Sequence, residues 1–177
     1  MNRTLSPLGA LLSYLIPGLG QICQGRTAKG LLFFFCIYGL FFYGMALGSW
    51  ENVYLPDTAH NAPPSKMPAL ITNLYNRLPF LGQFWIGVAA WPAVYQYWNY
   101  DDANEDGGGL FGNFERAPRS EETINKLQRE GNKTWDLGWV YTVIAGVLNI
   151  LVIYDALAGP AFAEAEQRQA YEEERRQ

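Results

Sequence analysis

Alternating acidic and amide side chains in the second half of the chain form its clearest ligand-binding pattern. Asp102, Asn104 and Asp106 occupy alternate positions, and a glycine follows them. This matches the opening of an EF-hand-like calcium loop, in which alternating oxygen atoms and a turn glycine surround a hard cation. The position of the bidentate glutamate is held by Asn113, and Glu115 comes two residues late. A solvated acidic turn explains the same residues, so both interpretations stay open.

Other residue types that carry chemistry are sparse. The single histidine, His60, lies in a proline-rich stretch without a metal-ligand pattern, and Cys23 and Cys36 are too far apart for a CxxC pair. The sequence contains no nucleophile elbow, phosphate loop or zinc pattern. We therefore predict no enzymatic activity, no metal site beyond the calcium candidate and no cofactor. A net charge of −4 also gives no reason to expect a nucleic-acid partner.

Long stretches without any charged residue dominate the chain instead. Each has about 18 residues or more, the length that a helix needs to cross the hydrocarbon core of a bilayer. The stretches are 4–25, 30–50, 78–100 and 137–154. Trp and Tyr gather at several of their ends, as at Trp50, Trp98 and Tyr154, and amphipathic rings favour the headgroup level of a membrane. Lipid is therefore the expected solvent for most of the chain.

The first charge-free stretch contains its own interruption. Leu5–Ile16 can form a helix of only about 18 Å, at 1.5 Å per residue, before Pro17, Gly18 and Gly20 break the pattern. This element is a kinked span, a re-entrant segment or an interfacial segment. In each case the break is expected to pack against a neighbouring helix.

The sequence thus predicts an all-α fold, a polytopic membrane protein with three to four transmembrane helices and an N-terminal hairpin that is kinked or re-entrant. Pro92 predicts a kink in the third apolar stretch. Gly159-Pro160 is expected to end the last membrane helix. The expected segments are a membrane hairpin over 1–50, a proline-rich loop over 51–77, a transmembrane helix over 78–100, a polar insert with a short helix over 101–136, a transmembrane helix over 137–158 and a polar helical tail over 159–177.

Small and polar residues on the apolar stretches predict faces for helix packing. Gly44 and Gly48 form a GxxxG pattern, and a second stripe repeats at helical spacing on the last apolar stretch. The expected packing residues are Pro17, Gly18, Gly20, Gly44, Gly48, Gly138, Thr142, Gly146 and Asn149. Gln21, Gln24, Gln83 and Gln96 hydrogen-bond between helices, line a water-filled path or bind a lipid or pigment head group. No charged residue lies in the middle of a stretch, which argues against ion-coupled transport.

One motif carries a resemblance to a known family. The run from Leu15 to Gln21 (LIPGLGQ), followed by Gly25-Arg26 and Lys29-Gly30, resembles the TM-two domain, a small domain of two transmembrane helices. It is also similar to uncharacterised bacterial membrane proteins that share a PGLGQ–GR–KG pattern. The acidic-Arg-Phe loop signature of the TM-two family is missing, since Thr27 follows Arg26. The resemblance implies a membrane hairpin over about residues 5–48.

These patterns lead to a hypothesis for function. The chain is expected to be a non-enzymatic, multi-pass protein of the bacterial inner (cytoplasmic) membrane that acts as a scaffold, assembly factor or accessory subunit. Its partners would be membrane lipids and either other integral membrane subunits or further copies of itself. The alternatives are an oligomeric passive channel or carrier for small solutes or lipids, and a membrane module that senses calcium or a partner through its polar insert.

Overall fold

A computed structural model of the chain describes residues 5–55, 78–98, 114–115 and 133–175. All regular elements within these ranges are helical, which confirms the predicted all-α class. They are α1 (Pro7–Leu15), α2 (Leu19–Cys23), α3 (Thr27–Leu47), α5 (Leu78–Phe84), the 3-10 helix η1 (Gly87–Ala90), α6 (Trp91–Trp98) and α8 (Lys133–Glu174). Most of the predicted loop at 51–77 and insert at 101–136, with all the candidate calcium residues, lies outside the described residues.

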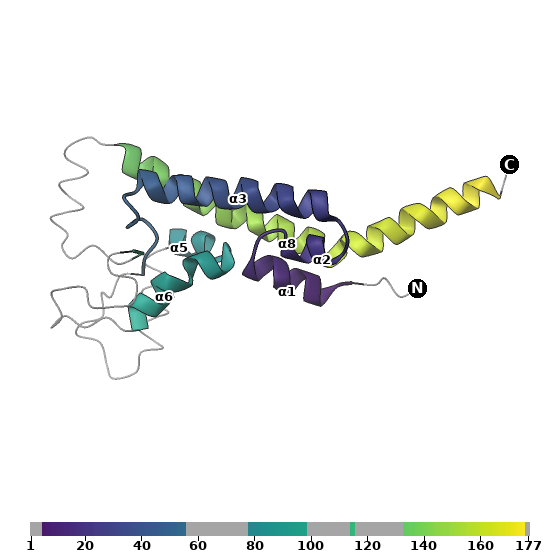
Figure 1. The fold of residues 1–177 in the computed structure, drawn as a ribbon, viewed down its shortest axis with the longest axis horizontal. Coiled ribbons are helices and arrows are strands. Elements are labelled where there is room, and N and C mark those ends of the chain that lie inside the picture. Colours follow the sequence, from purple (N-terminus) through teal and green to yellow (C-terminus); the bar gives the residue numbers. More distant parts are fainter. Residues whose placement is uncertain (1–4, 56–77, 99–113, 116–132, 176–177) are drawn as a thin grey trace.

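The two long helices form the body of the molecule. Among the described residues, Thr27–Leu47 and Lys133–Ala161 are the helices long and apolar enough to cross a membrane. They run antiparallel beside each other (Figure 1). Gly44 makes their close approach possible, because a Cβ there would collide with the carbonyl oxygen of Gly138 and with Thr142.

Helices α1 and α2 form a short helix pair at one end of this body. Ser6 caps α1 by accepting a hydrogen bond from the Gly9 amide at 3.3 Å. The helix stops before Pro17, and Gly18 turns the chain with a φ of 84°. α2 then packs back on α1, where the amide of Gly20 donates to the Ser13 hydroxyl at 3.1 Å.

The predicted transmembrane helix at 78–100 is divided into two short helices. The break lies at Gly87, whose φ of 82° ends α5, and η1 then leads into α6. Both α5 and α6 extend from η1 toward the end of the molecule where α3 ends (Figure 1). The kink expected at Pro92 is absent because this proline stands in the first turn of α6, where its missing N–H breaks no helical hydrogen bond.

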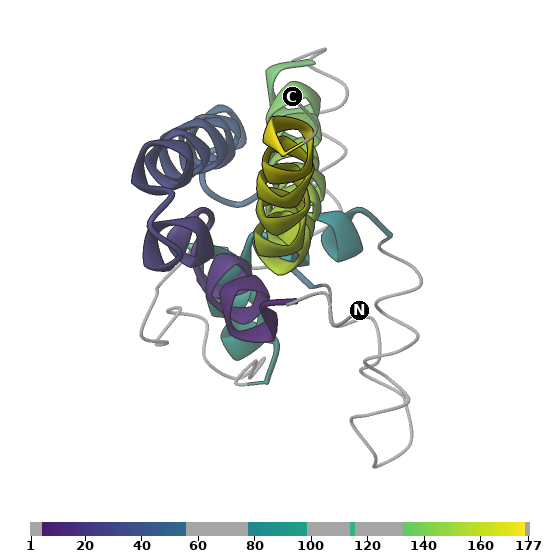
Figure 2. The same ribbon diagram turned by 90° about the vertical axis from the view of Figure 1, so that its right-hand side faces the viewer.

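The boundary expected at Gly159-Pro160 is also wrong. α8 continues through Pro160 to Glu174, so the predicted membrane helix over 137–158 and the predicted tail form one element. Its C-terminal part projects beyond the other helices on the side where α1 begins (Figure 1), and this part faces the viewer in Figure 2.

Among the described residues, several polar side chains are buried and several large apolar side chains are exposed. Gln21, Gln83 and Asn149 are fully buried, at 0% exposure, whereas Phe35 and Leu151 are 68% and 64% exposed. An apolar core also exists, and its largest members are Phe41, Phe80, Met45 and Ile86. Polar groups are therefore enclosed by the helices while much of the outer surface is aliphatic and aromatic.

Candidate functional site

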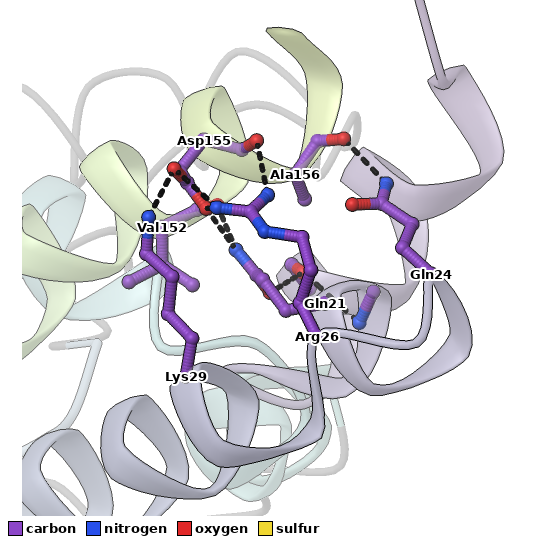
Figure 3. A network of polar contacts seen from close by, with 9 residues as sticks. Gln21, Gln24, Arg26, Lys29, Val152, Asp155 and Ala156 are labelled. Atoms are coloured by element: carbon purple, nitrogen blue, oxygen red, sulfur yellow. Dashed lines mark hydrogen bonds and ion pairs between the residues drawn. The ribbon is translucent and has the colours of Figure 1, made fainter. Parts of the chain in front are cut away.

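A cluster of polar contacts joins α2, the start of α3 and the turn between them to the middle of α8. We call it the α8 clasp; it comprises Gln21, Gln24, Arg26 and Lys29 on one side and Val152, Asp155 and Ala156 on the other (Figure 3). The Asp155 carboxylate lies 2.9 Å from the Arg26 guanidinium and 2.6 Å from the Lys29 ammonium. The three charged side chains are partly exposed, so water weakens these ion pairs.

Gln21 is the buried member of the clasp and uses both ends of its amide. Its Nε2 donates to the carbonyl oxygen of Val152 at 2.9 Å and to Asp155 Oδ2 at 3.1 Å. Its Oε1 accepts a hydrogen bond from the Ser13 hydroxyl at 2.9 Å. This side chain therefore connects α1, α2 and α8.

Glycines in the same motif bring the backbones together. Gly18 lies so close to Gly30 of α3 that a Cβ on either residue would collide with the other's carbonyl oxygen. Gly25 turns the chain with a φ of 80°, which directs Arg26 and the first turn of α3 toward Asp155. The Gly-rich motif therefore fixes the geometry from which the basic side chains reach α8.

The clasp also explains how α8 passes through a proline. Pro160 has no N–H, so the carbonyl of Ala156, four residues earlier, loses its helical donor. Gln24 Nε2 donates to this oxygen at 2.6 Å, and the amide of Ser6 donates to the neighbouring carbonyl of Leu157 at 2.9 Å. The Gln24 side chain and the Ser6 backbone amide thus donate hydrogen bonds to α8 carbonyl oxygens near Pro160.

Asn149, which precedes the clasp residues in α8, connects the ends of two short helices. Its Nδ2 donates to the carbonyl oxygen of Ser13 in the last turn of α1 at 3.1 Å, and to that of Trp85, just after α5, at 2.8 Å. The two helices approach from opposite ends of the molecule, and Gly87 lies against the carbonyls of Tyr14 and Leu15. Helix C-termini carry partial negative charge, so an amide donor suits this junction.

A second polar cluster lies near the N-terminal end of α8. Gln83 Nε2 donates to Thr142 Oγ1 at 2.8 Å and to the backbone oxygen of Asn52 at 3.2 Å. The side chain of Asn52 in turn donates to the carbonyl of Gly44 at 2.9 Å. Gly146 completes the contact with α5, since a Cβ there would collide with the carbonyl of Gly82.

Comparison with known proteins places the whole arrangement in one family. A family model described as "Family of unknown function (DUF6677)" matches residues 8–169. The chain belongs to this family. The DUF6677 match begins in α1 and ends in α8, so it includes the clasp, the Asn149 junction and the second cluster. No curated protein and no solved structure matches the chain.

The predicted packing residues can now be located. Gly138, Thr142, Gly146 and Asn149 contact α3, α5 and α1 of the same chain, and Gly48 lies against Asn52. Asp155 directly follows the charge-free stretch 137–154, and the sequence patterns did not pair it with Arg26 and Lys29. The available signal was a lone acid at the end of an apolar stretch and a short loop containing bases but no acid.

The clasp offers hydrogen-bond donors and charged side chains. Among the described residues, no three or more His, Cys, Asp or Glu are grouped so that they could hold a metal ion. Cys23 and Cys36 are free and exposed. The clasp is therefore suited to holding helices in register.

Proposed function

We propose that this protein is a multi-pass protein of the inner (cytoplasmic) membrane that works as a non-enzymatic scaffold, assembly factor or accessory subunit. The observation that carries the proposal is the combination of large apolar side chains on the outer surface with amide side chains buried between the helices. Residues such as Leu8 and Phe35, at 67% and 68% exposure, would be unfavourable in water, while the amides enclosed between helices would suit an apolar solvent.

The two acidic residues that bound the charge-free part of α8 are separated by about the thickness of a bilayer core. Asp136 and Asp155 are 19 residues apart, which is about 28 Å along a helix at 1.5 Å per residue, close to the roughly 30 Å hydrocarbon core. Arg26 and Lys29 at the start of α3 lie beside Asp155, so one interface would run through the clasp. The proposed topology therefore has two full spans, α3 and α8.

The remaining apolar elements are proposed to be re-entrant. α1 has 9 residues, about 14 Å at 1.5 Å per residue, and so reaches only part of the way across. In this proposal α1–α2 enters from the side of the clasp and α5–η1–α6 from the opposite side, meeting at Asn149. Irregular backbone at membrane depth must be covered by protein, which the contacts of Gly87 with α1 support.

A role in assembly is supported by the hydrogen bonds of the buried polar side chains, which stay within the chain. Gln21, Gln83 and Asn149 all donate to atoms of their own chain, leaving an apolar outer surface for lipids and for other integral membrane subunits or further copies. The outward face of α3 offers a shallow site for a partner helix, because Gly39 has no neighbouring atom within 4 Å. Close helix approach at such small residues drives association in membranes.

Site-specific photo-crosslinking in intact membranes tests this role. A photoreactive residue at Phe35 or Leu151 faces outward, and the matched control at Phe41 is fully buried. A scaffold or subunit gives a discrete protein adduct from at least one outward position and none from Phe41. Adducts with lipid alone from both outward positions would contradict the assembly role. Release of the protein by alkaline carbonate would contradict membrane insertion.

A passive channel or carrier formed by several copies is the second candidate. It is favoured by buried acceptor atoms without a hydrogen-bond donor, which include Asn52 Oδ1, Gln83 Oε1 and Asn149 Oδ1. Such acceptors suit water in a polar path. Proteoliposomes that show no solute or lipid flux above protein-free vesicles would rule out this candidate.

A further inference from the structure

The carboxyl group of Glu115 is buried without a counter-ion on the elements known to contact it. Its side chain is fully enclosed, at 0% exposure. Oε2 accepts a hydrogen bond from the Ala93 amide in the first turn of α6 at 3.0 Å, and Oε1 has no donor. A buried carboxylate with one partner is strongly unfavourable, and taking up a proton removes the charge.

The backbone around Glu115 joins separate parts of the fold. Its amide donates to the carbonyl of Trp50 at 3.0 Å, and the neighbouring Phe114 ring lies 6.1 Å from the Trp50 ring. Gln96 of α6 donates to the carbonyl of Phe114 at 2.7 Å. Glu115 itself has a φ of 53°, a left-handed conformation that disfavours a side chain and is kept by these contacts.

Neither the segment that follows α3 nor α6 offers a cation to this carboxyl group. The ionisable side chains that these two elements carry within the described residues are Glu51, Tyr54, Tyr95 and Tyr97. α8 begins at the same end of the molecule with Lys133 and Asp136, which are both exposed (Figure 1). Burial raises the pKa of Glu115 from 4.5 to about 8, and the Ala93 hydrogen bond offsets only part of this effect.

We propose that Glu115 is a proton-binding residue whose protonation fastens residues 114–115 to α6 and to the segment after α3. The protonated carboxyl stays buried near neutral pH, and loss of the proton favours an open form in which the carboxylate reaches water. This makes the attachment sensitive to the pH on one side of the membrane, whichever partner the protein has.

The sign of the effect follows from the two pKa values. The open form has an ordinary glutamate pKa and the closed form has the raised one, so the closed form binds the proton more tightly. The attachment is strongest below about pH 4.5, weakens as the pH rises toward 8 and levels off above that value. Release of one proton makes opening about tenfold more favourable per pH unit within this window.

Hydrogen exchange of the α6 backbone amides measures the opening in the full-length protein in detergent. Dividing the exchange rate in the wild type by the rate in Glu115→Gln removes the intrinsic pH dependence of exchange. The side-chain amide of the introduced glutamine has the shape of the carboxyl group but does not titrate. We expect this ratio at Ala93 and Val94 to rise about tenfold per pH unit between about pH 5 and 7. The matched control Glu51→Gln, on the neighbouring segment, should retain the wild-type rise.

A constant ratio over this range would overturn the proposal. If Glu115→Gln does not fold, infrared difference spectroscopy of the wild type and Glu51→Gln gives a separate test. A protonated carboxyl signal present at pH 6 and lost above pH 8 in both proteins is expected. Absence of this signal at pH 6 would overturn the proposal as well.

Discussion

The side-chain amide of Gln24 lies 2.6 Å from the carbonyl oxygen of Ala156, the oxygen that Pro160 leaves without a helical donor. This contact joins residues that are 132 positions apart. It supplies a hydrogen bond that α8 cannot make for itself, and α8 continues past the proline instead of ending there.

Replacing Gln24 by Leu should therefore destabilise the protein in a way that depends on Pro160. Loss of the donor leaves a part-buried carbonyl unpaired, which costs about 1–3 kcal/mol. In a Pro160→Ala background the alanine N–H serves the carbonyl, and the same Gln24→Leu change should cost under about 1 kcal/mol. Chemical unfolding in mixed micelles measures the four proteins of this double-mutant cycle. Equal costs in both backgrounds would contradict the role of Gln24.

Asp155→Asn should weaken the clasp only moderately. The side chains of Arg26, Lys29 and Asp155 are 30%, 43% and 26% exposed, so we expect a loss of about 1 kcal/mol. The wild type should also lose stability as salt is added, whereas Asp155→Asn should respond less. Asp136 is an exposed acid at the other end of the charge-free part of α8, so Asp136→Asn is the matched control and should change stability little. A salt response that is the same in the wild type and Asp155→Asn would show that the ion pairs contribute nothing.

Asn149→Leu should lower the free energy of unfolding by more than the loss of one hydrogen bond. It removes the donor of two backbone carbonyls, at Ser13 and Trp85, with an expected cost of about 2–6 kcal/mol because each buried group left unpaired costs about 1–3 kcal/mol. The outward residue Leu151, changed to Asn, tests whether any polar change in this part of α8 has the same effect. We expect cross-linking between cysteines introduced at Tyr14 and Val88 to fall in Asn149→Leu, because the two short helices separate. Unchanged cross-linking would show that Asn149 does not hold this junction.

Gly146→Ala and Gly39→Ala should have opposite effects on stability. A Cβ at Gly146 would collide with the carbonyl of Gly82, whereas a Cβ at Gly39 meets nothing within 4 Å. Alanine at Gly39 should stabilise α3 by up to about 1 kcal/mol through helix propensity, and alanine at Gly146 should cost about 1–3 kcal/mol through forced backbone shifts. Thermal unfolding in one detergent compares the two variants directly. A stabilising Gly146→Ala would contradict the close packing of α5 on α8.

Local properties of the chain were readable without a structure. The charge-free stretches predicted helices because length and polarity depend only on neighbouring residues, and α3 and the N-terminal part of α8 follow them. The break near Pro17 and Gly18 was also predictable, since a missing N–H and a positive φ act locally. Small residues marked the face of α8 that contacts the other helices.

The tertiary structure decided where a helix breaks when two local outcomes compete. Pro160 is tolerated in α8 because Gln24 and Ser6, from a distant part of the chain, donate hydrogen bonds to the nearby carbonyls of Ala156 and Leu157. Gly87 rather than Pro92 divides the third apolar stretch, because the backbone at Gly87 packs against α1. The pairing of Asp155 with Arg26 and the burial of Glu115 beside Ala93 likewise join positions far apart in sequence. Such contacts depend on which elements lie together in space, and residue type and spacing do not contain that information.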